Sequence, residues 1–122
     1  MPIYGAKDIF SYDVEQSKGD THNMISVLMN VHGLELQHAI DFVGDLCKQS
    51  IDRFTHERDN LPAFGPPIDK DVGIYVTGLA SWIVGSLHWS FESERYFGKK
   101  GKEVKSSRII ALRPSRIQSV SA

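Results

Sequence analysis

Residues 72–85 read Val-Gly-Ile-Tyr-Val-Thr-Gly-Leu-Ala-Ser-Trp-Ile-Val-Gly, and this stretch decides the fold class. Its apolar side chains cover most of the circumference of a helix, which is typical of a helix that is surrounded by other helices. Apolar residues also recur at helical spacing in residues 24–31 and 34–54, and residues 7–17 fit a first helix. No stretch alternates for long enough to predict a strand. The sequence therefore predicts an all-α protein of about four helices.

The ends of these helices have local signals. We expect Gly19 and Gly33 to interrupt the chain, and Asp20 or Thr21 to cap the second helix. His22-Asn23, near the start of that helix, is also expected to serve in capping. Three prolines and a glycine in residues 60–67 predict a loop.

After that loop, the last helix is expected from about Asp69 to Phe91. So few helices offer too few neighbours to cover it. The chain is therefore expected to be part of a larger bundle, or to associate with itself through this exposed apolar helix.

Composition excludes several classes of protein. A length of 122 residues allows one small domain or part of a larger one, and an apolar fraction of 41% supplies a core. The formal net charge of -1 argues against nucleic acid as the main partner. The single cysteine, Cys47, excludes an internal disulfide and fits a reducing compartment such as the cytoplasm. No apolar run is long enough to span a membrane.

Residues 7–15, Lys-Asp-Ile-Phe-Ser-Tyr-Asp-Val-Glu, carry the main chemical signal. On a helix, Ser11 and Glu15 lie one turn apart, so their oxygens converge. Two such oxygens suit Mg²⁺, which completes its coordination with water and substrate phosphate. Lys7 stands where a third oxygen ligand is expected, and an ammonium group cannot coordinate a cation. Asp8 lies on nearly the same stripe of the helix and offers a substitute.

Arg95 and Tyr96 form a second candidate site. The planar guanidinium suits phosphate oxygens, and a tyrosine hydroxyl adds a hydrogen bond. The alternative is an arginine that neutralises carbonyl groups at a helix end, or the nearby Glu92 and Glu94.

Together, Asp-Ile-Phe-Ser-Tyr-Asp-Val-Glu-Gln, then Gly-Asp-Thr-His-Asn, then Trp-Ser-Phe-Glu-Ser-Glu-Arg-Tyr-Phe resemble the C-terminal half of class I terpene synthases. The resemblance looks closest to the sesquiterpene synthases of basidiomycete fungi. It implies that Ser11 and Glu15 bind magnesium, and that Arg95 and Tyr96 contact the diphosphate of farnesyl diphosphate. In this family's motif an asparagine stands at the position of Lys7, and a separate Asp-Asp-x-x-Asp motif holds further magnesium ions.

The resemblance covers about residues 7–98 and predicts a partial, C-terminal portion of the terpene synthase helical bundle in residues 1–98. Residues 99–122 are expected to be a basic, solvated and mobile tail. Because the aspartate-rich motif is absent and Lys7 replaces a ligand, we expect a truncated carbon–oxygen lyase that is inactive alone. The alternative is a non-catalytic helical remnant or interaction module.

Overall fold

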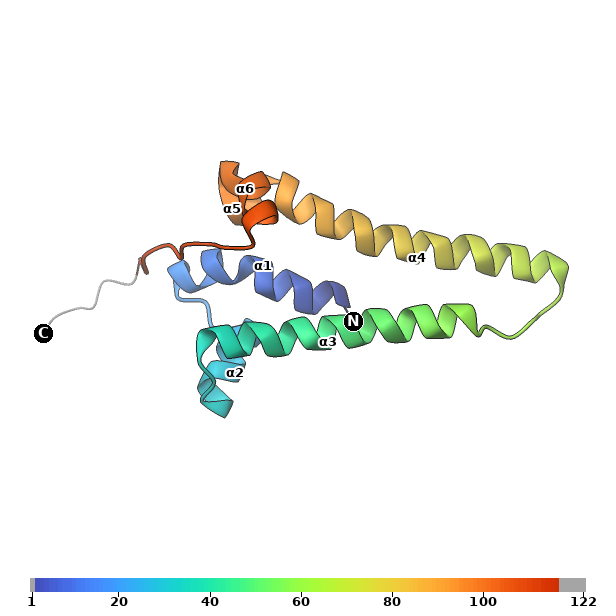
Figure 1. Ribbon diagram of the computed structural model, residues 1–122, viewed down its shortest axis with the longest axis horizontal. Helices are drawn as coiled ribbons and strands as arrows, with labels where there is room; N and C mark the ends of the chain where they lie inside the picture. Colours follow the sequence, from blue (N-terminus) through green and yellow to red (C-terminus); the bar gives the residue numbers. More distant parts are fainter. Residues whose placement is uncertain (1, 117–122) are drawn as a thin grey trace, which may run out of the picture.

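The computed structural model is built from helices (Figure 1). It describes residues 2–116, and statements about side chains concern residues 5–116. Within that range there is no strand, so the all-α prediction is confirmed. The elements, in chain order, are α1 (Pro2–Lys18), α2 (Met24–His32), α3 (Leu36–Asp59), α4 (Pro66–Glu92), α5 (Glu94–Phe97), the 3₁₀ turn η1 (Gly98–Lys100) and α6 (Gly101–Ser107).

Several helix ends lie where the sequence predicts them. Gly19 follows α1 and Gly33 follows α2, with left-handed φ angles of 77° and 63° that favour glycine. Two helices begin earlier than predicted: α1 at Pro2, and α4 at Pro66 instead of near Asp69. Proline is tolerated there because the N–H groups of a first turn have no partner within the helix.

For the cap of α2, the expectation of capping by His22-Asn23 is confirmed at Asn23, and the expectation of Asp20 or Thr21 is wrong. Asn23, and neither Asp20 nor Thr21, is the N-cap residue, and its side-chain oxygen accepts a hydrogen bond from the backbone N–H of Ile25 at 2.9 Å. Asp20 instead accepts from the backbone N–H of His22 at 2.9 Å, within the loop. The loop is therefore longer than the local pattern suggests, and α2 begins only at Met24.

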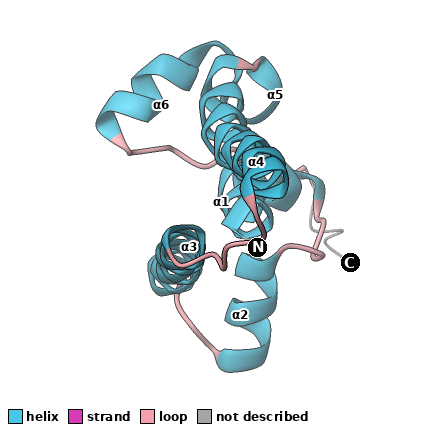
Figure 2. Cartoon of the chain, turned by 90° about the vertical axis from the view of Figure 1, so that its right-hand side faces the viewer, coloured by secondary structure: helices cyan, strands magenta, loops and turns pink. Residues whose placement is uncertain are grey.

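The core lies where α2 and α3 pack together and against α1. Its buried apolar residues are Ile25, Leu28, Ala39 and Val43. In Figure 1, α3 and α4 are two long helices joined by a loop at one end, and α1 lies between them at the other end. Figure 2 looks along the long helices and shows α2 and α3 on one side of α1, with α4, α5 and α6 on the other. The helix α1 is thus the element that links the two halves.

Much of α4 has no neighbour in the described part of the chain. The exposed fractions are 64% for Ile74, 68% for Tyr75 and 69% for Trp82. This exposure agrees with the prediction that so few helices cannot cover the apolar helix. No helix within residues 2–116 is both long enough and apolar enough to cross a membrane.

The basic C-terminal segment contacts the rest of the molecule. After α5 and η1, the helix α6 packs against α4, and the chain then returns to α1, where the backbone N–H of Arg116 donates to the carbonyl of Ser17 at 2.8 Å. Most side chains of residues 99–116 are exposed. The contact with α1 leaves no local pattern in the sequence, because it joins distant segments, and the solvated, mobile tail stays a prediction. Residues 117–122 of that predicted tail lie outside the described residues, and the division of the chain at residue 98 stays a prediction.

Candidate metal and diphosphate site

Ser11 and Glu15 meet on one side of α1, as their spacing predicts. Both approach the same atom: the Nδ2 of Asn23 lies 2.9 Å from Oε2 of Glu15 and 3.4 Å from Oγ of Ser11. Ser11 is only 3% exposed, whereas Glu15 is half-buried. The two oxygens therefore face a common point at the boundary between α1 and the start of α2.

Asn23 holds this arrangement in place. Because its Oδ1 caps α2, its Nδ2 must face α1, where it also donates to the backbone carbonyl of Asp8 at 2.7 Å. The side chain is fully buried, at 0% exposure, and both of its polar atoms have partners. Sequence reasoning identified a helix cap here and missed the contact with Ser11 and Glu15, because that contact depends on how the loop returns α2 to α1.

Lys7 and Asp8 occupy different surroundings. Lys7 is exposed. The Asp8 carboxylate accepts a hydrogen bond from the backbone N–H of Met24 at 2.9 Å, so it serves the N-terminus of α2. That bond uses Oδ2, and a carboxylate has a second oxygen for a metal ion, so the contact alone does not decide whether Asp8 replaces the lost ligand.

The oxygens of Ser11 and Glu15 are of the type that binds a hard cation, but they supply only two ligands. Hydroxyl and carboxylate oxygens are the ligand types that Mg²⁺ prefers, and Ser11 and Glu15 supply one of each. Within residues 5–116, no cluster of three or more histidine, cysteine, aspartate or glutamate side chains is arranged to hold a metal ion. Because the Nδ2 of Asn23 occupies the point where both oxygens converge, a cation would either displace that amide or use lone pairs directed away from it. It would take most of its other ligands from water or from a bound substrate.

Arg95 and Tyr96 lie on α5, which contacts α1. Tyr96 is 6% exposed, and its ring packs edge-on against Trp89 with centroids 6.0 Å apart. Arg95 is exposed, and its guanidinium lies 5.7 Å from the centroid of the Tyr96 ring.

Neither interpretation of Arg95 is decided by its contacts. In the described part of the chain no ion pair joins it to Glu92 or Glu94, and no hydrogen bond or ion pair joins it to Ser11 or Glu15. A diphosphate-binding role for Arg95 and Tyr96 stays a prediction.

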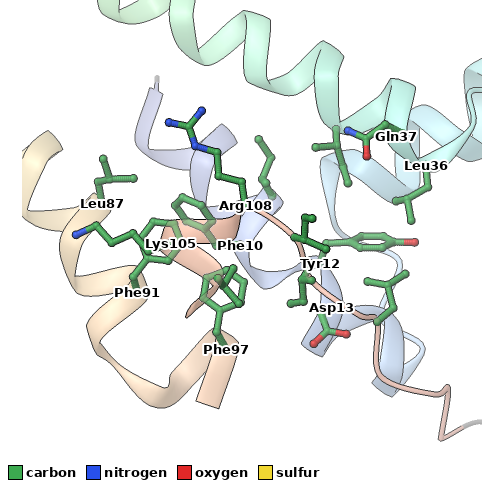
Figure 3. Close-up of a pocket in the computed structure, with 16 residues that line it drawn as sticks. Phe10, Tyr12, Asp13, Leu36, Gln37, Leu87, Phe91, Phe97, Lys105 and Arg108 are labelled. Atoms are coloured by element: carbon green, nitrogen blue, oxygen red, sulfur yellow. The ribbon is translucent and has the colours of Figure 1, made fainter. Parts of the chain in front are cut away.

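A separate apolar cavity of about 830 Å³ lies on another face of α1 (Figure 3). The rings of Phe10, Phe91 and Phe97 gather at one part of it, with Lys105 and Arg108 at the same edge. None of the four candidate site residues lines this cavity. It is therefore distinct from the point where Ser11 and Glu15 converge.

Comparison with known proteins gives a consistent result. Residues 4–53 match the family model described as terpene synthase family 2, C-terminal metal binding. Sesquiterpene synthase 1 of Postia placenta is 68% identical over 111 residues, which are 91% of this chain and 33% of the relative. Sesquiterpene synthase Agr1 of Cyclocybe aegerita is 68% identical over 109 residues, or 89% of this chain and 32% of the relative.

The alpha-muurolene synthase of Coprinopsis cinerea is 58% identical over 107 residues, 88% of this chain and 25% of the relative. The chain thus spans about a third or less of the length of these curated relatives. The family match includes Ser11 and Glu15, and the resemblance noted from sequence is confirmed. Residues 4–53 therefore match the C-terminal metal-binding region of the terpene synthase family, and the chain as a whole is similar to part of basidiomycete sesquiterpene synthases.

Proposed function

We propose that this chain provides a magnesium-binding and diphosphate-binding portion of a sesquiterpene synthase that acts on farnesyl diphosphate. The observation that carries the proposal is the convergence of Ser11 and Glu15 on one point, in a segment that matches the family's metal-binding region. Arg95 and Tyr96 are proposed to contact the diphosphate. A cytoplasmic location is part of the same proposal.

The residue types suit the chemistry. Ionisation of an allylic diphosphate places negative charge on the leaving group and positive charge on the hydrocarbon. When bound, magnesium would stabilise the departing diphosphate as a Lewis acid. Ser11 and Glu15 would anchor that cation on α1, while the planar guanidinium of Arg95 would offset charge on the diphosphate oxygens.

Two features indicate that these 122 residues do not turn over substrate by themselves. Lys7 places an ammonium group where the family has an asparagine ligand, and its charge opposes a nearby cation. The sequence also contains no Asp-Asp-x-x-Asp motif. We therefore propose binding of a magnesium–diphosphate pair, and no catalytic turnover, for this chain alone.

Isothermal titration calorimetry with inorganic diphosphate, with and without Mg²⁺, tests the proposal. We expect magnesium-dependent binding that weakens by about tenfold or more in Ser11→Ala and Glu15→Gln, because each removes one ligand oxygen or its charge. Matched controls are Ser81→Ala and Glu35→Gln, which change the same residue types at exposed positions. Equal loss in the controls, or no binding by the unaltered chain, would overturn the proposal.

Lys7→Asn tests the departure from the family motif. Because the change removes a positive charge and adds a carbonyl oxygen, we expect tighter magnesium–diphosphate binding than in the unaltered chain. Lys18→Asn is a control on the same helix, since Lys18 is also exposed. Unchanged affinity in Lys7→Asn would show that position 7 does not face the bound cation.

A second candidate function is a non-catalytic helical interaction module. It is favoured by the exposed apolar side chains along α4, among them Ile74, Tyr75 and Trp82. Such a module would self-associate through α4, and Trp82→Glu should then shift the chain toward monomer in analytical ultracentrifugation. A monomer at all concentrations of the unaltered chain would remove this candidate.

A further inference from the structure

The segment that follows α6 is hydrogen-bonded to α1 through the buried carboxylate of Asp13, which is not one of the candidate site residues. Asp13 lies between Ser11 and Glu15 in sequence, two residues from each, so it points to a different face of α1. It is 4% exposed. A carboxylate buried to this degree requires partners for its oxygens.

Arg113 provides both partners. Its backbone N–H donates to Oδ1 of Asp13 at 2.6 Å, and its guanidinium Nε lies 3.1 Å from Oδ2. The backbone carbonyl of Arg113 in turn accepts from Nε2 of Gln16 at 2.7 Å. One residue thus engages α1 through its N–H, its carbonyl and its side chain, across 100 residues of sequence.

The same guanidinium also reaches α5. Its Nη2 donates a hydrogen bond to the backbone carbonyl of Tyr96 at 3.4 Å. Tyr96 and its neighbour Arg95 are the candidate diphosphate contacts. The planar fork of Arg113 therefore spans α1, which carries the candidate metal ligands, and α5, which carries the candidate anion contacts.

The helix α5 needs such support. It has only four residues, and Ser93 at its N-cap makes no side-chain capping bond. A helix this short is not stable by itself, so its position depends on tertiary contacts. Within the described residues, the ring of Phe97 packs against Phe10 of α1 at 5.9 Å, and this apolar contact is less directional than the bonds of Arg113.

We propose that Arg113 is a positioning residue that, through Asp13 and the Tyr96 carbonyl, fixes the candidate anion contacts on α5 relative to the candidate metal ligands on α1. This inference rests on the proposed function. It adds that metal and diphosphate binding are coupled through the C-terminal segment. The ion pair of Arg113 with Asp13 is partly exposed to solvent, since the Arg113 side chain is 40% exposed. Its role is therefore to orient α5 relative to α1 and not to supply a large stabilisation.

The test uses the full chain and the same calorimetric titration of inorganic diphosphate with Mg²⁺. We expect Arg113→Ala and Asp13→Asn to weaken binding of the magnesium–diphosphate pair by about tenfold, a usual size for coupling between two sites. Binding of Mg²⁺ without diphosphate should stay unchanged, because neither variant removes a proposed ligand. Arg113→Lys should give an intermediate loss, since an ammonium group lacks the fork that reaches both acceptors.

The control is Arg116→Ala, because Arg116 contacts α1 through its backbone N–H and its side chain is exposed. A merely structural role would weaken Mg²⁺ binding and diphosphate-dependent binding together, and that result would overturn the inference. So would unchanged affinity in Arg113→Ala while Ser11→Ala and Glu15→Gln still lose binding, a result that leaves the proposed function standing. Absence of binding in the unaltered chain would instead refute the proposed function, and this inference with it.

Discussion

Substitutions at Asn23 can distinguish the energy of the α2 cap from the energy of the contact with α1, because the side-chain oxygen and nitrogen of Asn23 have different partners. Its Oδ1 caps α2, and its Nδ2 donates to the Asp8 carbonyl and to the Glu15 carboxylate. Asn23→Ser keeps a capping oxygen and loses the amide donor. Asn23→Ala loses both.

The magnitudes follow from those bonds. A hydrogen bond to a neutral acceptor contributes about 1 kcal/mol and one to a charged group about 1.5–3 kcal/mol, with the lower value suited to the half-buried Glu15. Asn23→Ser should therefore lower the free energy of unfolding by about 2–3 kcal/mol. Asn23→Ala should cost about 1 kcal/mol more, the usual value of a lost N-cap.

Asn23→Asp tests the electrostatic interaction between position 23 and the Glu15 carboxylate. It keeps the capping oxygen and places a second carboxylate against Glu15, so we expect a larger loss than in Asn23→Ser at neutral pH.

The measurement is urea unfolding followed by far-ultraviolet circular dichroism. Asn30→Ser is the matched control, since Asn30 is exposed on α2, and its change should stay within about 0.5 kcal/mol. If Asn23→Ser unfolds at the same urea concentration as that control, the contact between Asn23 and α1 has no energetic value and the reasoning fails.

Three further predictions concern the packing of α1 and α2 on α3. Ile25→Ala should destabilise the chain by about 2–5 kcal/mol, since Ile25 is 0% exposed in the core; Ile25→Val, at about 1 kcal/mol, is the graded comparison in urea unfolding. Gly5→Ala places a Cβ 2.8 Å from Sγ of Cys47, so it should lower the melting temperature, and the loss should be smaller when Cys47 is also alanine. Equal losses in both backgrounds would contradict that clash. Burial raises the pKa of the Cys47 thiol, so the folded chain holds its proton at pH values where the unfolded chain has lost it. The free energy of unfolding should therefore fall as the pH rises above about 8.5, and Cys47→Ser should remove that slope.

Local chemistry determined the helices, several of their ends and the shared face of Ser11 and Glu15. Helical periodicity, the left-handed preference of Gly19 and Gly33, and an i,i+4 spacing act over a few residues, so they can be read without a structure. The family resemblance rested on short motifs of the same kind. The exposure of α4 was also predictable, since its apolar circumference exceeds what so few helices can cover.

Only the tertiary structure decided which side chains meet across distant segments. The contact of Asn23 with Glu15 depends on the path of the loop after α1, and the pair of Asp13 with Arg113 joins residues 100 positions apart. Hydrogen bonds form between groups that the folded chain brings within about 3 Å, and their formation leaves no periodic pattern in either segment. The arrangement of the candidate ligands around α1 is therefore a property of the packed chain, although the ligands themselves are visible in its sequence.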